Sequence, residues 1–269
     1  MEKITTQELR LYYRFAFEFI SSFCIFEITT PCYYKINKRK RLIVRIPFLG
    51  NFYFKKGKIH RDKGKPAIDF IDGSKWFYKF GKKHRSNDKP AVEKINGTKI
   101  WYRHGKLHRI NGPAVAYSSG TIEFWKDGNL HQLDGPAIYY HFNNNIDDYI
   151  REEWWQHGMR HRENHPAYIN YIRYREQDIY TMTLSKTEWW YKGNLHCLSG
   201  PAIHKGDKVD GTKKYYMYGE EINKQEFIKR IKLVKRFINN LKKKYKKKIE
   251  NKLQECFCKV LVQEILLFL

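Results

Sequence analysis

The sequence lacks the features that define most membrane proteins, disulfide-rich proteins and zinc-binding proteins. Its most apolar stretch, Leu11 to Phe26, contains Arg14 and Glu18, and it is shorter than the roughly 20 uncharged residues of a membrane-spanning helix. The cysteines are odd in number and have no zinc-binding spacing: Cys24, Cys32, Cys197, Cys256 and Cys258. We therefore expect no transmembrane segment and no secretion. Free thiols point to a reducing compartment, the cytoplasm or the nucleus.

Acidic residues are also scarce. The 269 residues include 28 Asp and Glu against 52 Lys and Arg, a formal charge of +24, and 42% of the chain is hydrophobic. That apolar fraction suffices for an ordered core in one large or two small domains. No Walker loop, Gly-x-Ser-x-Gly elbow or His-Glu-x-x-His motif occurs. We expect no enzyme, and assign no catalytic residue, cofactor or metal.

A repeat runs through the middle of the chain. Six of the eight prolines occur as Pro-Ala, at successive spacings of 24, 23, 23, 30 and 35 residues. A histidine precedes each proline by five or six residues, and a glycine precedes each histidine by three. These Gly/His/Pro sets are Gly57/His60/Pro66, Gly81/His84/Pro90, Gly105/His108/Pro113, Gly128/His131/Pro136, Gly158/His161/Pro166 and Gly193/His196/Pro201. A recurring register of this kind predicts a repeat architecture.

Two adjacent aromatic residues stand four and three positions before each glycine. The pairs are Tyr53/Phe54, Phe77/Tyr78, Trp101/Tyr102, Phe124/Trp125, Trp154/Trp155 and Trp189/Trp190. Tyr215 and Tyr216 before Gly219 form a seventh pair, but Ile222 stands where the histidine belongs, so the array ends there. Adjacent strand residues point to opposite faces, so each pair places one aromatic ring on each face of a sheet. One face packs inward; the other is either covered by a terminal helix or open to a partner.

Local sequence predicts that each unit is a β-hairpin. Short aromatic and β-branched runs alternate with Asp72-Gly73, Asn96-Gly97 and Ser119-Gly120, which favour tight two-residue turns with positive φ. A second turn, centred on the glycine and the residue before it, brings the first aromatic opposite the histidine. The proline then suits the first residue of a strand. The extra residues around 143–148 and 174–185 are expected to project as loops from one edge.

The repeat resembles a known family. Gly105-Lys106-Leu107-His108-Arg109 followed by Asn111-Gly112-Pro113-Ala114 is similar to the MORN-like repeats of phage and giant-virus proteins. The resemblance covers about Asn51 to Phe227, and Tyr218 to Ile222 resembles the family's last repeat. It implies an elongated hairpin solenoid used for association, a viral protein acting in its host cell, and no catalytic residue.

The regular histidines admit two interpretations. Zinc needs three or four ligands that converge on one point, whereas histidines in neighbouring two-stranded units lie roughly 10 Å apart. We therefore expect structural histidines, each packed on an aromatic ring and hydrogen-bonded to the adjacent turn. A single zinc or acid–base site is the alternative.

The two ends of the chain predict helices outside the array. Thr5 with Glu8 matches a capping box for a helix from about Thr6 to Ser22, followed by a short strand over Leu42 to Phe48. Asn223 with Glu226 predicts the cap of a second helix, whose apolar stripe comprises Phe227, Ile231, Val234, Ile238, Leu241 and Tyr245. The expected domains are residues 1–49, a terminal cap; 50–222, the array; and 223–269, a basic helical segment.

The second helix carries much of the excess positive charge. Residues 224–252 contain thirteen Lys and Arg and two Glu. The candidate anion-binding residues are Lys242, Lys243, Lys244, Lys246, Lys247 and Lys248. They form either a nuclear-localisation, nucleic-acid or acidic-lipid contact, or a solvated helix face.

Two functions from different classes follow. The first is a non-enzymatic scaffold that binds a protein partner through its sheet face or projecting loops, because every regularity found serves folding. The second is an electrostatic binder of nucleic acid or acidic membrane through the lysine-rich helix.

Overall fold

The computed structural model describes residues 2–4, 32–36, 41–143, 148–176, 179–206 and 211–249. The fold is mainly β, with 44% strand and 10% helix, and consists of many antiparallel hairpins with one C-terminal helix. The predicted hairpin-repeat fold is therefore confirmed. The expected N-terminal helix, Thr6 to Ser22, lies outside the described residues. Two compact units can be distinguished, residues 1–160 with 170–183, and residues 161–169 with 184–269.

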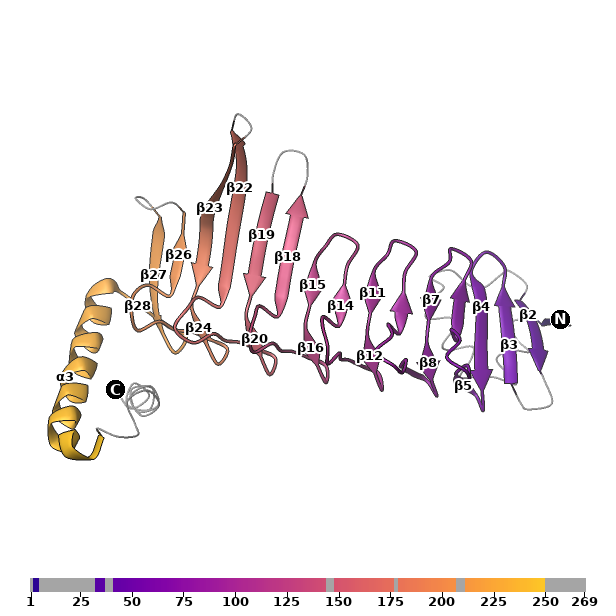
Figure 1. Cartoon of the computed structure of the whole chain (residues 1–269), viewed down its shortest axis with the longest axis horizontal. Helices are drawn as coiled ribbons and strands as arrows, with labels where there is room; N and C mark the ends of the chain where they lie inside the picture. The colour runs from indigo at the N-terminus through magenta and orange to yellow at the C-terminus, as the bar shows by residue number, and fades with distance from the viewer. Residues whose placement is uncertain are drawn as a thin grey trace. The chain divides into compact units, whose positions relative to one another are not determined.

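In the first unit the main strands pair in chain order, so that each antiparallel strand contacts the one before it and the one after it (Figure 1). These strands are β1 (Glu2–Ile4), β2 (Cys32–Ile36), β3 (Arg41–Ile46), β4 (Gly50–Lys55), β6 (Ile68–Phe70), β7 (Lys75–Trp76), β10 (Val92–Glu93), β11 (Lys99–Ile100), β14 (Val115–Ala116), β15 (Ile122–Glu123), β18 (Ile138–Asn143) and β19 (Asp148–Glu153). Long side chains on one face of β4, Phe52 and Phe54, alternate with half-buried ones and form the core with Val44 and Ile68.

Each repeat adds a second, smaller hairpin. In the first repeat the end of β4 pairs with the two-residue strand β5 (Lys58–Ile59). In the later repeats of this unit both strands of the small hairpin are two residues long. These pairs are β8 (Tyr78–Lys79) with β9 (Lys82–Lys83), β12 (Tyr102–Arg103) with β13 (Lys106–Leu107), β16 (Trp125–Lys126) with β17 (Asn129–Leu130), and β20 (Trp155–Gln156) with β21 (Met159–Arg160). The first aromatic of each pair lies at the joint between the main and the small hairpin. At this joint the N–H of Phe77 donates to the carbonyl of Ala91, and its carbonyl accepts from the N–H of His84. The predicted pairing of the first aromatic with the histidine is confirmed.

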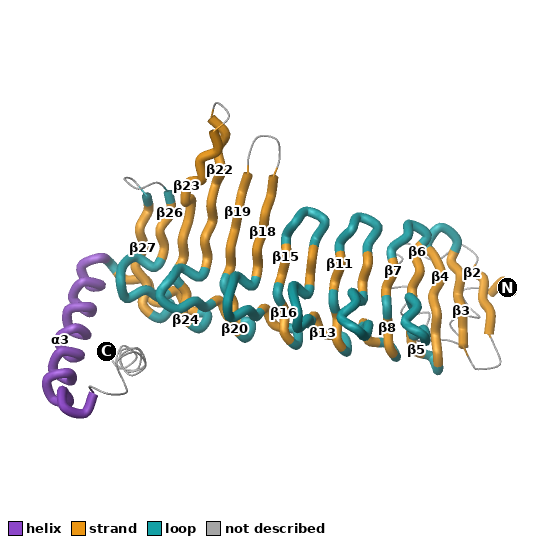
Figure 2. The backbone as a smooth tube through the Cα atoms, viewed as in Figure 1, coloured by secondary structure: helices purple, strands orange, loops and turns teal. Residues whose placement is uncertain are grey.

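The two kinds of turn differ in geometry. The small hairpins turn through two residues with positive φ, as predicted; Phe80 and Gly81 have φ of 48° and 88°. The main hairpins do not have the predicted two-residue turn. Gly73 N–H donates to the Phe70 carbonyl, and Phe70 N–H donates to the Ser74 carbonyl, which defines a three-residue loop with positive φ at the glycine alone. Figure 2 shows the two sets of turns along opposite edges of the first unit.

Two long insertions were expected as loops, at about 143–148 and 174–185. Residues 144–147 lie outside the described residues, and β18 and β19 pair over six residues each up to Asn143 and Asp148 on either side of them. The second expectation was wrong, because this insertion lies largely in β22 (Tyr168–Glu176) and β23 (Ile179–Glu188), which contribute residues to both units.

The expectation that each proline begins a strand was also wrong. In all six repeats the strand begins two residues after the proline, at Ile68, Val92, Val115, Ile138, Tyr168 and Ile203. The prolines concerned are Pro66, Pro90, Pro113, Pro136, Pro166 and Pro201. The alanine between proline and strand already donates its N–H to the neighbouring strand, as Ala67 does to Trp76. Proline lacks this N–H, so it precedes the hydrogen-bonded ladder instead of joining it.

The second unit contains the end of the array. It comprises the last part of β23, the small hairpin β24 (Trp190–Tyr191) and β25 (Asn194–Leu195), then β26 (Ile203–Lys205), β27 (Thr212–Met217), β28 (Glu220–Ile222) and the helix α3 (Lys224–Ile249). Tyr215 of β27 pairs with Ile222 of β28, so the isoleucine does take the place of the histidine. No helix among the described residues has the length and apolar character needed to cross a membrane.

Candidate functional site

Each repeat histidine is hydrogen-bonded to the small turn of the next repeat. Its Nδ1 atom accepts the backbone N–H of the residue before the next glycine, over N···N distances of 3.1 to 3.4 Å. In chain order the donors are Phe80, His104, Asp127, His157, Lys192 and Tyr218. Several donor side chains also stack on the ring, as Phe80 does on His60 with ring centroids 4.2 Å apart. The histidines therefore connect consecutive repeats, and we call this series of six hydrogen bonds the histidine ladder.

This role requires neutral imidazole rings. Nδ1 accepts a hydrogen bond only when the ring proton is on Nε2. Burial lowers the pKa of His84, His131 and His161 below the ordinary value, and it lowers the pKa of His196 to about 4. At these four histidines the hydrogen bond to the next repeat is therefore intact at neutral pH.

The histidines do not converge on one point. Among the described residues, no group of three or more His, Cys, Asp or Glu side chains is arranged to hold a metal ion. His60 has a carboxylate at its other nitrogen, where Nε2 lies 2.8 Å from Oδ1 of Asp62. This hydrogen bond, together with one from Lys55, lowers the pKa of Asp62 to about 2. Cys197 is a free, buried thiol.

The other residues of the repeat signature also serve the backbone. All six glycines have φ between 72° and 90°, a region that L side chains rarely adopt: Gly57, Gly81, Gly105, Gly128, Gly158 and Gly193. The alanine after each proline is fully buried: Ala67, Ala91, Ala114, Ala137, Ala167 and Ala202. No larger side chain fits there without displacing its neighbours.

An arginine directly after the histidine closes the histidine–proline loop in four repeats. Its Nη1 donates to the carbonyl of the proline: Arg61 to Pro66, Arg85 to Pro90, Arg109 to Pro113 and Arg162 to Pro166. In the first three of these repeats the guanidinium also lies over the first aromatic of the same repeat, 3.6 Å from the ring centroid of Phe77 for Arg85. This contact was not predicted, although arginine follows four of the six histidines in the sequence.

The remaining two prolines depart from this arrangement. Pro136 and Pro201 have no guanidinium donor from the same loop, because Gln132 and Cys197 take the place of the arginine. Their loops are held at the backbone N–H of that same residue, a contact that Arg109 and Arg162 also make in their repeats. The N–H of Gln132 donates to the Trp155 carbonyl, and the N–H of Cys197 donates to the Tyr216 carbonyl. The proline position is therefore common to all six repeats, whereas the arginine contact is not.

Four tryptophans of the repeats donate hydrogen bonds to acidic or backbone groups. Nε1 donates to a glutamate two residues earlier in three repeats: Trp125 to Glu123, Trp155 to Glu153 and Trp190 to Glu188. Trp101 donates instead to the Asp88 carbonyl and is only 8% exposed. These contacts give the rings a structural role, and the part played by the glutamates was not predicted.

The turns that join β3 to β4, β6 to β7 and β10 to β11 carry exposed apolar side chains. We call Phe48, Ile71 and Ile95 the tip row; their exposed fractions are 86%, 70% and 68%. The turns are linked, because Ile71 N–H donates to the Leu49 carbonyl and Ile95 N–H donates to Oγ of Ser74. The tip row thus has a fixed register along one edge of the first unit.

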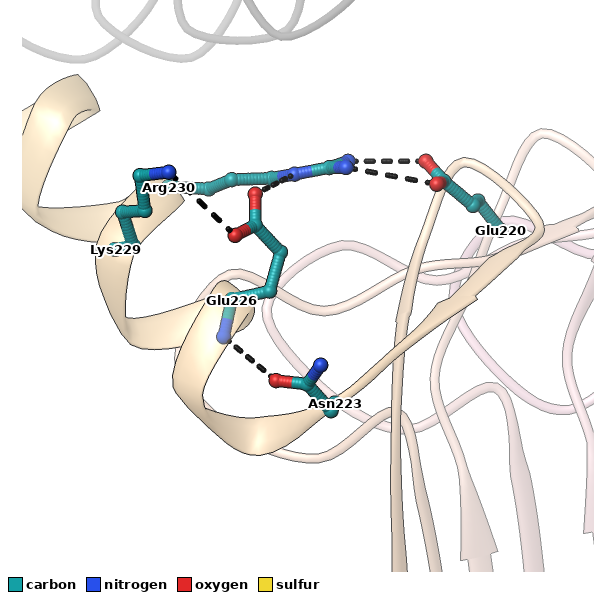
Figure 3. Close-up of polar contacts among 5 residues, drawn as sticks. All are labelled: Glu220, Asn223, Glu226, Lys229 and Arg230. Carbon is teal, nitrogen blue, oxygen red and sulfur yellow. Dashed lines mark hydrogen bonds and ion pairs between the residues drawn. The ribbon is translucent and has the colours of Figure 1, made fainter.

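The start of α3 is fixed to the end of the array. Oδ1 of Asn223 accepts the N–H of Glu226 at 2.8 Å, which confirms the predicted cap (Figure 3). Arg230 donates from Nε to Glu226 and from Nη1 to Glu220 of β28 (Figure 3). The guanidinium holds the pKa of Glu220 below its ordinary value. On the apolar stripe Phe227 is buried and lies against Tyr215, with ring centroids 4.9 Å apart.

The candidate anion-binding lysines lie in the last turns of α3. Lys242 is exposed. The side chains of Lys243, Lys244, Lys246, Lys247 and Lys248 lie outside the described ones. Earlier in the helix, Lys232, Lys235 and Arg236 are exposed and make no ion pair within the described residues.

No protein-family model matches the chain, and no curated protein matches it.

Proposed function

We propose that the protein is a non-enzymatic repeat scaffold of the MORN-like type that binds a protein partner, and that it is a viral protein acting in a host cell. The non-enzymatic part of this proposal is supported by the structural contacts that the polar side chains of the repeat make. Histidine, arginine and glutamate are each engaged in contacts that hold the array together. Groups held in this way are not free to act on a substrate.

The tip row carries the protein-binding part of the proposal. Three large apolar side chains in adjacent, linked turns form an exposed patch bordered by polar turn residues such as Asp72 and Asn96. Exposed apolar patches of this kind mark association sites, and an apolar centre with a polar rim is typical of protein interfaces. The residues lie at turns, so their side chains can be exchanged without affecting the core.

The test compares two matched variants as bait in cell extract. The variant Ile71→Asp/Ile95→Asp removes the tip row, whereas the control Ile110→Asp/Leu133→Asp changes two side chains of similar exposure, 74% and 61%, in histidine–proline loops. A partner protein that cross-links to the native chain and to the control, and is lost with the tip-row variant, supports the proposal. If both variants retain every captured protein, the tip row is not the binding surface.

A second candidate function is supported by the exposed cations of α3. Lys232, Lys235 and Arg236 have no acidic partner among the described residues, so nucleic acid or acidic lipid can neutralise them through residues 224–252. For nucleic acid, log affinity falls with log salt by about 0.9 for each phosphate contact. Replacing these three residues by Gln should reduce that slope, while the same change at the exposed Lys56, Lys58 and Lys75 should not. Flotation with acidic vesicles is the corresponding lipid assay.

A further inference from the structure

The first two histidine–proline loops are one residue longer than the others. His60–Pro66 and His84–Pro90 each span six positions, whereas His108–Pro113 and the later loops span five. Both longer loops end in a lysine, Lys65 and Lys89, where the later ones have glycine or histidine. The repeat itself does not require this length, because the later repeats make the same arginine–proline contact without it.

The two longer loops enclose a groove of about 530 Å³. This volume lies within the range of small-molecule sites, roughly 300 to 1,000 Å³. Six cationic residues line it: Arg61, Lys63, Lys65, Lys79, Arg85 and Lys89. Asp62 is the only carboxylate among the lining residues, and it already pairs with His60 and Lys55. The groove therefore has a large excess of positive charge.

The two arginines are held in place before any ligand arrives. Arg61 donates to the Pro66 carbonyl and lies 3.6 Å from the ring centroid of Tyr53. Arg85 is fixed in the same way and also donates to Glu93 at 2.7 Å. A guanidinium has five N–H donors, so each arginine retains donors for a ligand. Fixed donors lose little conformational entropy on binding.

The lysines supply charge that the protein itself leaves unbalanced. Lys63, Lys65, Lys79 and Lys89 are exposed and make no ion pair in the part of the chain that the structure describes. A bound anion would relieve their mutual repulsion. The aromatic rings beside the groove cannot stack on a ligand, because Phe77 and Tyr78 are 4% and 7% exposed. Recognition in the groove therefore depends on negative charge.

We propose that this groove binds an oligophosphate chain, either inorganic or as the triphosphate of a nucleotide. Several linked phosphates match several cations in one groove, where a single monovalent anion would balance only one. Phosphate oxygens also accept paired N–H donors from arginine. The site lies in the loops of the first two repeats and is independent of the tip row.

The test is calorimetric titration of the full chain with tripolyphosphate and, separately, with ATP at matched ionic strength. We expect saturable binding with one site per chain. The variant Lys65→Gln/Lys89→Gln should weaken binding at least about tenfold, since it removes two of the six cations that face the phosphates. The control Lys75→Gln/Lys99→Gln removes two exposed lysines of the same unit outside the groove, and it should leave affinity within about twofold.

A second variant tests the groove itself. Deleting Lys63 and Asn87 restores the five-position spacing of the later loops and should abolish the site without altering the histidine ladder. Equal affinity for ATP and tripolyphosphate identifies the chain of phosphates as the ligand, and tighter binding of ATP identifies a nucleotide. Lack of saturable binding, or equal weakening by the groove and control pairs, would overturn the proposal.

Discussion

Tyr218 donates its backbone N–H to Nδ1 of His196 at 3.3 Å, and the two rings stack with centroids 4.2 Å apart. The same backbone contact occurs at every repeat histidine. The ring stays neutral because His196 is buried, and its side chain fixes the turn of the following repeat.

Acidification should destabilise the array. The pKa of His196 is about 4 in the folded chain and 6.5 in the unfolded chain, so the unfolded state binds more protons between these values. Stability is therefore complete above pH 6.5 and is lost as pH falls towards 4, by up to about 3 kcal/mol for this residue. Urea unfolding between pH 8 and pH 5 measures the loss. A free energy of unfolding that is flat over this range would show that the rings are not held neutral.

His161 offers a direct test of the acceptor. Its Nδ1 accepts the N–H of Lys192 at 3.3 Å, and the residue is 8% exposed. The change His161→Leu should cost about 1 to 3 kcal/mol, because it leaves a buried N–H without an acceptor. His161→Asn keeps an acceptor oxygen near the same position and should cost less. Chemical denaturation compares the two, and equal losses would contradict the hydrogen-bonding role.

Arginine and lysine should not be equivalent after the histidine. Arg85 donates to the Pro90 carbonyl and to Glu93 while it covers the ring of Phe77. Lysine cannot make these planar contacts together, so Arg85→Lys should lower the free energy of unfolding by about 1 to 2 kcal/mol. Arg103→Lys, at an exposed position in the next small hairpin, is the control and should change little. Similar losses of stability at both positions would contradict the proposed role of the Arg85 guanidinium in holding the histidine–proline loop.

The alanine after each proline should not tolerate enlargement. Ala114 is fully buried, and its N–H and carbonyl both bond to neighbouring strands. Ala114→Val should therefore destabilise the chain by about 1 to 3 kcal/mol through overpacking. Ala116→Val, at a half-buried strand position of the same repeat, should be close to neutral. Thermal unfolding of both variants measures the difference.

The repeat register and the small turns were predictable from the sequence. Glycine, histidine and the aromatic pair recur at fixed offsets, and those offsets determine which backbone groups face each other. The partner of Nδ1 was foreseen only as an adjacent turn, because sequence offsets cannot show that the ring reaches forward to the next repeat. The length of β18 and β19 was not predicted, because the sequence analysis placed only the additional residues 143–148 and did not extend the strand pairing over the aromatic residues Tyr139 to Phe142.

The basic groove was harder to predict from the sequence, because the sequence feature that marks it is small. One additional residue between His60 and Pro66 has little effect on a repeat pattern, yet the groove lies between the two loops that contain such a residue. The lysine before Pro66 and Pro90 was visible in the sequence as well. Its significance required the three-dimensional neighbourhood of both loops, which local propensity does not encode.

The residue that donates its N–H to each histidine differs in nearly every repeat: Phe80, His104, Asp127, His157, Lys192 and Tyr218. The hydrogen bond to the histidine uses only the main chain at this position, so a substitution there keeps the bond and loses at most a side-chain contact such as the ring stacking that Phe80 and Tyr218 provide. Branching at the β-carbon is the exception, since valine, isoleucine and threonine resist a left-handed backbone. A protein engineer could therefore use this edge to display chosen chemical groups at regular intervals.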